Sequence, residues 1–465
     1  MQAGFALVES GSVNRKNRGA MLVKNIYNVA VAVIAFWLCG YGLGFGTPQY
    51  FVGNSPWFFA SYGFEQVPQD NYLYWIITFA YCTVVVAIFQ GALAERTQLF
   101  AYLIISALLA GFVFPIILAW TWGQGWLASY GFHDFSGTGI VHLVGGTAAF
   151  WGALIVGERR AKVRAREDLA TRVEVDIKNA ELQSELDDLH PDFSKIAKKH
   201  FKGHDGELSR NSSVFIVLGT LLIWASYIFF VGGRTLSQTN PRSSASSKII
   251  QNMFIASSFS ALLSAFLKPL ALGTLGSRAT KYDCLTLCNG ALVGMIAVSG
   301  AVDRIENWSA VLIGSIAAFW YVGDILFLEF CRIDDPLEVV PVHFAGGVWG
   351  LFAVGFFDNF SGALFTTSIH QGKFMGFQLV GIAAIVGFTS VVTLTAFLVL
   401  SKLEMLRADK AIEEIGFDVA ELQPGVSEEF IDAVREKIEA REEQEKKRQK
   451  FADEEQERNT KKSVL

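Results

Sequence analysis

Charged residues are scarce in this sequence. They make up 18% of its 465 residues, whereas a soluble domain carries about 25%. They are also unevenly spread, because segments 158–210 and 402–465 hold 24 and 31 of the 83 and the other 348 residues hold 28. This scarcity excludes an ordinary water-soluble core, a coiled coil and a disordered main body, and it indicates a polytopic membrane protein. The net charge of −5 leaves no basic footprint for nucleic acid.

Cysteine is also rare, and its five positions are scattered: Cys39, Cys82, Cys284, Cys288 and Cys331. An odd number without regular spacing predicts no disulfide framework. Cys284 and Cys288 could share a helix face, but a metal site needs more ligands, so we expect small buried side chains. The sequence shows no nucleophile–base–acid set. We therefore expect no metal, no cofactor and no enzymatic activity.

Long apolar runs are what the sequence has in abundance. Their length and all-round apolarity favour membrane helices over barrel strands, which would alternate and be nearer ten residues. Such runs lie at 24–46, 71–93, 97–120, 138–157, 213–233, 248–268, 284–300, 308–331, 339–357 and 373–401. A further apolar segment at 1–8 is short, since ten helical residues reach about 15 Å, half a bilayer. We therefore predict an all-α polytopic membrane protein whose first helix does not span or lacks its beginning.

Lysine and arginine in short loops set the expected orientation. A basic group at 15–18 follows the first segment, Arg96 follows the third, and a basic cluster at 159–166 follows the fifth. The alternate loops, 47–70 and 123–137, contain neither lysine nor arginine. If the short first helix counts as a span, eleven crossings place the N-terminus outside and the C-terminus inside.

This pattern divides the chain into four parts. They are membrane helices 1–5 in 1–157, a charged cytoplasmic loop in 158–210, membrane helices 6–11 in 211–402 and a charged cytoplasmic tail in 403–465. In the tail, Phe430, Val434 and Ile438 form a weak apolar stripe. The stripe predicts a frayed amphipathic helix, followed by a charged and largely disordered end. Binding of a partner is the alternative role of this tail.

Two histidines lie inside apolar runs, His142 in GIVHLVGG and His343 in PVHFAGGVWG. An imidazole within a membrane helix is costly unless it meets a polar partner or lines a cavity. The neighbouring glycines would let the two helices approach closely. The pair therefore suggests a narrow path that both side chains face. The alternative is a core histidine bonded to a nearby carbonyl.

Asp134 and Trp122 precede the first of these histidines. Asp134 lies eight residues before His142, about 12 Å along a helix, and it could cap that helix and add negative potential at its mouth. Trp122 could offer a cation–π surface to a small cation, or it could be an aromatic belt residue at the membrane interface. Farther along, Asp334-Asp335-Pro336 is interpreted as a helix stop and restart signal.

Taken together, these segments resemble the ammonium transporter family (Amt/Mep/Rh), and most closely its Amt branch. The resemblance covers about 1–425, apart from the 158–210 insertion. The motifs that carry it are MQAGFALVESGSVNRKN (1–17), GALAERT (91–97), WGQGWLASYGFHDFSGTGIVHLVGG (122–146), NGALVGMIAVSG (289–300) and RIDDPLEVVPVHFAGGVWG (332–350). It implies eleven transmembrane helices in two inverted halves around a central pore, with the first helix N-terminally shortened here. It also implies a homotrimer with one pore per subunit, or a heterotrimer with related subunits.

The functional residues of the family carry over onto matching positions. The resemblance implies that His142 and His343 are the histidine pair of the pore. It implies that Asp134 is the acid above the first histidine and that Trp122 belongs to the outer recruitment site. No metal ligand is implied.

The gate and the recruitment site depart from the family pattern. Phe230 matches one of two gating phenylalanines, and the second falls on Tyr81, which keeps a ring but adds a hydroxyl. Arg234 replaces a recruiting serine in FVGGR. An arginine pointing into the vestibule would repel ammonium at about 5 Å by roughly 0.8 to 3 kcal/mol, unless it paired with Asp134. An arginine that snorkels outward would have little effect, and the sequence leaves both orientations open.

The resemblance implies transport of ammonium, and of methylammonium, across a lipid bilayer that we expect to be the plasma membrane. A pore that passes neutral ammonia discriminates against potassium more easily than one that passes a bare ion, and histidine suits this step because it donates, accepts and titrates near neutral pH. One alternative is an ammonium sensor or low-flux member that acts through its cytoplasmic segments. Another is a subunit that only assembles with functional siblings.

The start of the tail, 406–418, resembles the family segment that docks under neighbouring pores. We expect that deletion of 404–425 reduces transport and leaves trimers intact.

Overall fold

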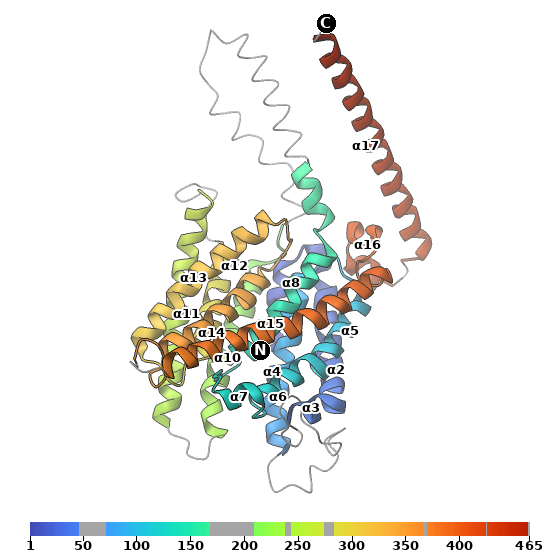
Figure 1. Cartoon of the computed structure of the whole chain (residues 1–465). Coiled ribbons are helices and arrows are strands. Elements are labelled where there is room, and N and C mark those ends of the chain that lie inside the picture. The colour runs from blue at the N-terminus through green and yellow to red at the C-terminus, as the bar shows by residue number, and fades with distance from the viewer. Residues whose placement is uncertain are drawn as a thin grey trace.

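The computed structural model describes residues 1–45, 71–167, 209–237, 243–273, 283–365, 370–424 and 426–463. Within these ranges the chain is helical and contains no β-strand (Figure 1). The first half contains α1 (Gln2–Ser12), α2 (Arg18–Ala35), α3 (Tyr41–Phe45), α4 (Asn71–Ala92), α5 (Leu99–Leu108), α6 (Phe114–Trp120), α7 (Trp126–Tyr130) and α8 (Val144–Val156). The second half and the tail contain α10 (Ser213–Gly233), α11 (Ser243–Ala271), α12 (Cys284–Ser299), α13 (Asn307–Phe330), α14 (Gly346–Phe357), α15 (His370–Lys402), α16 (Lys410–Ile415) and α17 (Glu428–Ser463).

The apolar helices of the described chain correspond one to one with the predicted runs. Eight are long enough to cross a membrane: Arg15–Phe45, Tyr72–Ala92, Leu99–Trp120, Thr138–Val156, Ser213–Gly233, Ala245–Ala271, Asn307–Phe330 and Gly372–Lys402. Two are shorter, Cys284–Ser299 and Pro341–Phe357. The prediction of an all-α polytopic membrane protein is confirmed.

The short first segment forms α1, which packs along α10. The two helices cross at glycines. A Cβ on Gly4 would lie 2.7 Å from the carbonyl oxygen of Gly219, and a Cβ on Gly219 would lie 2.6 Å from that of Gly4. Only glycine permits this approach, and it brings α1 into the interior of the bundle.

The helices α8 and α14 each continue from a π-helical turn, and each packs against the turn that precedes the other. These turns are η6 (Thr138–Leu143) and η9 (Pro341–Ala345). A Cβ on Gly146 of α8 would lie 2.4 Å from the backbone nitrogen of Phe344, so the glycines give the close approach that the sequence predicted. The helix α15 packs against both α8 and α14 across the bundle (Figure 1).

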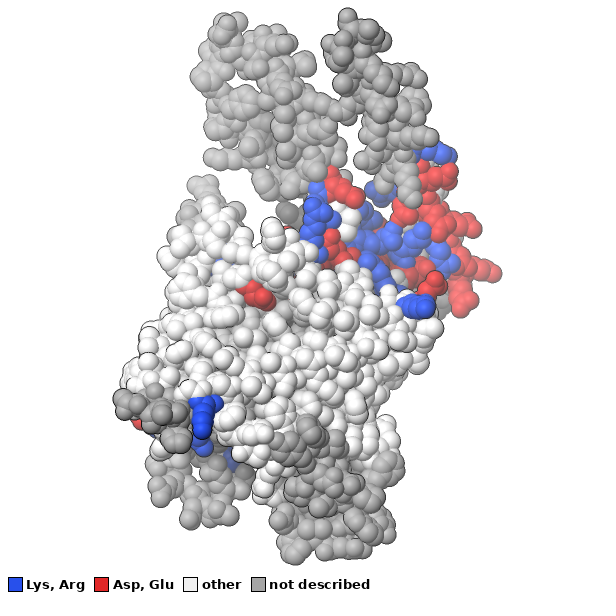
Figure 2. Space-filling view, viewed as in Figure 1, with Lys and Arg blue, Asp and Glu red and all other residues white. Residues whose placement is uncertain are grey.

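Most of the described charged side chains gather at one end of the bundle, named here the charged end, around α16 and the segment after α8 (Figure 2). At its centre the buried carboxylate of Asp334 accepts from Arg159 Nε at 2.7 Å, and Arg159 also pairs with Glu95 at 2.5 Å. Burial alone would raise the pKa of Asp334, but the guanidinium groups of Arg159 and Arg96 outweigh it and hold that pKa below its ordinary value. An ion-pair cluster therefore closes this end.

The segment around Asp334 interrupts the helices as predicted. The helix α13 ends at Phe330, and η9 begins at Pro341. Between them Asp335 Oδ2 accepts from the backbone nitrogen of Val340 at 2.7 Å. The two aspartates thus do more than stop a helix, because one joins the ion-pair cluster and the other caps the next turn.

The tail folds back onto the first half of its own chain. The carboxylate of Asp418 accepts from the backbone nitrogens of Gly19 and Ala20, at 3.0 and 2.8 Å, and so caps the start of α2. The ring of Phe417 is buried, and the Lys24 ammonium lies 3.8 Å from its centroid. These contacts attach the start of the tail to its own chain, and docking under neighbouring pores stays a prediction.

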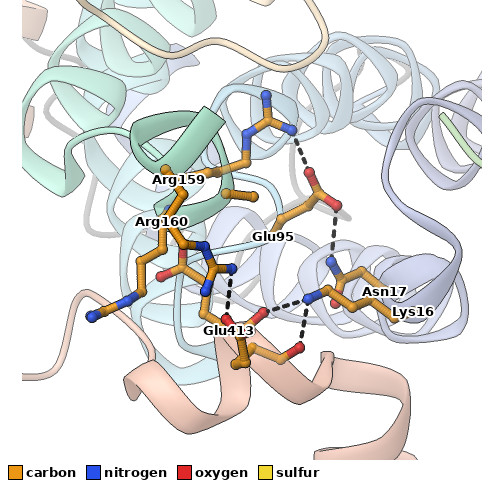
Figure 3. Close-up of a pocket in the computed structure, with 9 residues that line it drawn as sticks. Lys16, Asn17, Glu95, Arg159, Arg160 and Glu413 are labelled. Carbon is orange, nitrogen blue, oxygen red and sulfur yellow. Dashed lines mark hydrogen bonds and ion pairs between the residues drawn. The ribbon is translucent and has the colours of Figure 1, made fainter. Parts of the chain in front are cut away.

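A small pocket lies where the tail meets the first half (Figure 3). Lys16 Nζ donates to the carbonyl oxygen of Glu413 at 2.9 Å, and the backbone nitrogen of Arg160 donates to Glu413 Oε1 at 2.6 Å. Asn17 Nδ2 donates to Glu95 Oε1 at 2.9 Å. Because these polar groups bond to one another, the pocket is a seam between segments.

The described tail differs from the predicted one at its end. The sequence predicts disorder after the Phe430–Ile438 stripe, but α17 is one helix over Glu428–Ser463. Opposite charges four residues apart, such as Glu443 and Lys447 at 2.7 Å, favour a solvated helix. Of the 158–210 loop only 158–167 and 209–210 are described, with 160–167 helical, and the rest lies outside the described residues.

Candidate functional site

Two histidines from different halves of the chain meet inside the bundle. His142 Nδ1 and His343 Nδ1 are 3.0 Å apart, with ring centroids 5.2 Å apart and ring planes within 11°. Both side chains are buried. One Nδ1 must donate the shared proton and the other must accept it, so the two rings cannot both be charged. The structure brings together the two histidines that the sequence singled out.

Each histidine lies in a π-helical turn with an aspartate eight residues before it. Such turns are rare and occur mostly at functional sites. The Asp134 carboxylate accepts four backbone N–H groups at 2.8–3.1 Å, those of Gly137, Thr138, Gly139 and Ile140. Asp335 likewise accepts the backbone N–H of Val340, directly before η9. Because Asp335 lies at the charged end and Asp134 at the other, the two halves place their histidines with inverted direction.

Tyr227 is a third polar group at this pair, and sequence reasoning missed it. Its hydroxyl lies 3.0 Å from His142 Nε2, and the side chain is buried. Tyr227 lies on α10, one helical turn before Phe230. A tyrosine on the same helix face as a candidate gate residue, within an apolar run, is the signal that could have identified it.

Three aromatic rings cluster at the end opposite the charged end, and they come from α4, the loop after α6, and α10. The ring centroids of Tyr81 and Phe230 are 4.6 Å apart, and those of Tyr81 and Trp122 are 4.9 Å apart. Trp122 Nε1 donates to the carbonyl oxygen of Asp134 at 2.7 Å. The Trp122 ring thus packs against the bundle, which is not the position of a belt residue facing lipid.

Arg234 lies over this aromatic cluster. Its Cζ is 3.7 Å from the centroid of Trp122, 5.5 Å from that of Phe135 and 5.7 Å from that of Tyr81. Burial raises the pKa of Asp134, and the positive charge of Arg234 offsets part of that rise. Of the two orientations that the sequence left open, the structure has the inward one. The guanidinium is therefore stacked on the ring face that could receive a small cation.

Two cavities adjoin the histidine pair. One is lined by both histidines, Tyr227 and apolar side chains such as Phe5, Leu292 and Ile296. The other begins at His343 and is lined mostly by apolar groups of α1, α4 and α12. The mostly apolar lining of the first cavity favours a neutral molecule over an ion. In the described residues, no group of three or more His, Cys, Asp or Glu side chains could hold a metal ion.

The chain matches the family model described as Ammonium Transporter Family over residues 1–177 and 195–425. It is 30% identical over 458 residues to ammonium transporter 1 member 3 of Solanum lycopersicum, and the match covers 90% of this chain and 88% of that one. Ammonium transporter Amt2 of Archaeoglobus fulgidus is 29% identical over 440 residues, which cover 90% of this chain and 84% of that one.

Solved structures show the same fold. A sensor Amt protein superimposes with a TM-score of 0.73 at 25% identity, covering 91% of this chain and 94% of that chain. Saccharomyces cerevisiae Mep2 superimposes with a TM-score of 0.66 at 22% identity, covering 88% and 84%. The match to the family model over most of its length shows that this chain belongs to the ammonium transporter family.

Proposed function

We propose that this chain transports ammonium across a membrane and that the conducted species is ammonia moving past His142 and His343. The observation that carries this proposal is the buried histidine pair beside a cavity lined mostly by apolar groups. A dehydrated ion would be far costlier there than a neutral molecule. The curated relatives, which are named ammonium transporters, support ammonium as the substrate.

The charge distribution supports an orientation. Basic residues are enriched in cytoplasmic loops of membrane proteins, and the charged end contains Arg159, Arg160 and the docked tail. The charged end therefore faces the cytoplasm and the aromatic cluster faces outside, with the plasma membrane as the membrane concerned. By family membership the functional unit is a homotrimer with one pore per subunit.

The aromatic cluster serves as the outer recruitment site and gate. The Trp122 ring offers a cation–π surface, and the contact between Tyr81 and Phe230 closes the way to the histidines. Both carboxylate oxygens of Asp134 already accept hydrogen bonds from backbone N–H groups, four in all. It acts on a recruited cation through its potential and not through direct contact.

Uptake of labelled methylammonium in a transporter-deficient host tests the pore. His142→Ala and His343→Ala should each lower the initial rate about tenfold or more, equivalent to at least roughly 1.4 kcal/mol. The matched control is His133→Ala, because His133 pairs with Asp303 away from the pore. Wild-type uptake that survives both pore substitutions would contradict conduction past the histidines.

A second candidate function is ammonium sensing with little flux, and the position of Arg234 favours it. The guanidinium stacks on the Trp122 ring, where a recruited ammonium ion would otherwise bind. A tethered cation at that ring competes with a free one. The protein would then bind ammonium only weakly, and the docked tail would carry the response.

Arg234→Ser separates the two candidates. If Arg234 only weakens recruitment, wild type transports and the variant transports with a KM lower by about thirtyfold, the equivalent of a desolvated cation–π contact of roughly 2 kcal/mol. If the chain is a low-flux member, wild type shows no uptake and Arg234→Ser restores it. Uptake by both proteins with the same KM would remove any role for Arg234 at the outer site.

A further inference from the structure

A carboxylate lies in the cavity beyond His343, and neither the histidine pair nor the outer site uses it. This cavity is lined mostly by apolar side chains, and its polar side chains are His343, Glu9 and Asn289. Glu9 comes from α1 and is 5% exposed. An ionised carboxylate so deeply buried is costly unless it meets a partner that repays the desolvation.

The position of Glu9 along α1 is on the route from the histidines to the charged end. At one end of α1 the Phe5 ring lies 6.4 Å from the His343 ring. At the other, the backbone nitrogen of Asn14 donates to Glu95 Oε1 at 2.7 Å. Glu9 is four residues after Phe5, about 6 Å along the helix. It therefore follows the histidine pair in the direction of the proposed inner exit.

The known partners of Glu9 leave it room for a ligand. Asn25 Nδ2 donates to Glu9 Oε2, and in the described chain Oε1 accepts no hydrogen bond. Lys24 is the nearby cation, but its ammonium donates to the carbonyl oxygen of Thr97 at 3.1 Å and lies over Phe417. No salt bridge joins Lys24 to Glu9 among the described residues.

Asn289 completes the polar side of the cavity. Its Nδ2 donates to the carbonyl oxygen of Leu337 at 2.9 Å and to Glu338 Oε2 at 3.1 Å. These bonds fix which end of the amide is the donor and keep its carbonyl oxygen as an acceptor. A carboxylate oxygen and an amide oxygen suit a small cation with several N–H donors.

We propose that Glu9 and Asn289 form an inner cation site that holds one ammonium ion after the histidines. Ammonia that has passed His343 combines there with one proton from inner water, and the ammonium ion donates N–H groups to Glu9 Oε1. The identity of the ligand rests on the proposed function. The site traps the conducted molecule as an ion and so hinders its return through the apolar cavity.

Methylammonium uptake measures the contribution of the site to flux. Glu9→Gln keeps an oxygen that can accept from Asn25 and removes the charge. We expect the maximal rate to fall about tenfold, roughly 1.4 kcal/mol, with the KM unchanged because the outer site sets it. Glu9→Asp should recover part of the rate. Glu329→Gln is the matched control, since its carboxylate is 69% exposed at the charged end.

Thallium(I), a monovalent cation, tests binding directly. Crystals of the full-length wild-type protein soaked in a thallium salt should show an anomalous peak within contact distance of the Glu9 carboxylate, and crystals of Glu9→Gln should not. Unchanged maximal rate in Glu9→Gln, or no thallium peak at wild-type Glu9, would overturn the inner site. If Glu9→Gln does not fold, the wild-type peak decides. If His142→Ala leaves the rate of uptake unchanged, the proposed function is contradicted. The inner site is judged separately, because the thallium peak reports on Glu9 alone.

Discussion

The two ends of the bundle are closed by different forces. At the charged end the half-buried Arg159 joins the buried carboxylates of Asp334 and Glu95 in an ion-pair cluster. At the other end the rings of Tyr81, Trp122 and Phe230 contact one another, and the guanidinium of Arg234 stacks on Trp122. Salt bridges lock a surface in place, whereas stacked rings can part for a ligand. The comparison indicates that ion pairs hold the charged end together, and it fits our proposal that the aromatic end is the gate.

The largest expected effect is a loss of stability when the ion-pair cluster at the charged end is broken. Asp334→Asn leaves the buried Arg96 and the half-buried Arg159 with less negative charge beside them. Removing one partner of a buried ion pair costs about 3–5 kcal/mol. The variant should unfold at a markedly lower temperature in detergent, measured beside the exposed control Glu329→Gln. Equal melting temperatures would mean that the ion-pair cluster does not hold this end.

Acidification should weaken the same ion-pair cluster. The folded-state pKa of Asp334 is depressed below its ordinary value of 3.8, so its stabilising contribution is complete above that value and is lost as the pH falls further, through the folded pKa. The melting temperature of wild type should therefore fall below about pH 4, and that of Asp334→Asn should fall less over the same range. An identical acid profile in both proteins would assign the decline to other groups.

A smaller loss is expected at the aromatic end. Asp134→Asn keeps one acceptor oxygen and loses backbone N–H bonds at the start of η6, at a cost of about 2 kcal/mol. Trp122 loses no partner, because its Nε1 binds the Asp134 backbone carbonyl. Uptake should fall further than the change in melting temperature alone explains, since negative potential at the gate also disappears. Asp335→Asn, at the start of η9, is the matched control from the other half.

The smallest expected effect concerns the tautomer of His142. Tyr227→Phe removes the hydroxyl at 3.0 Å from His142 Nε2, worth about 1 kcal/mol for a neutral hydrogen bond. The rate of methylammonium uptake should change by about fivefold, and the pH dependence of uptake should shift while the protein elutes unchanged. A merely structural tyrosine would lower the amount of folded protein and leave the pH profile as it was.

Most of the fold could be predicted from the sequence because lipid imposes a simple rule. A membrane helix forms its own backbone hydrogen bonds and presents apolar side chains to lipid, so it is recognised in the sequence as a long apolar run. The glycines around His142 and His343 indicated close packing of their helices. The π-helical turns could not be predicted, since their side chains do not differ from those of an α-helix. The continuous α17 was missed because apolar periodicity carries no signal for a helix held by charge pairs.

The candidate site was predictable where a residue type is unusual for its surroundings. An imidazole in an apolar run is costly, which singled out His142 and His343. The direction of Arg234 depends on a rotamer and on rings from three distant segments, so no local pattern could settle it. Tyr227 and Glu9 were missed because a single hydroxyl in an apolar helix, or a carboxylate near a helix end, is common. The packing of α10 and α1 brings them to the cavities beside the histidines.

The cap that Asp418 places on α2 has a consequence for biosynthesis. The helix emerges from the ribosome almost 400 residues before its capping carboxylate does, so its first backbone N–H groups wait for water or lipid headgroups throughout translation. Chains that stop early would expose this unfinished helix end at the membrane surface.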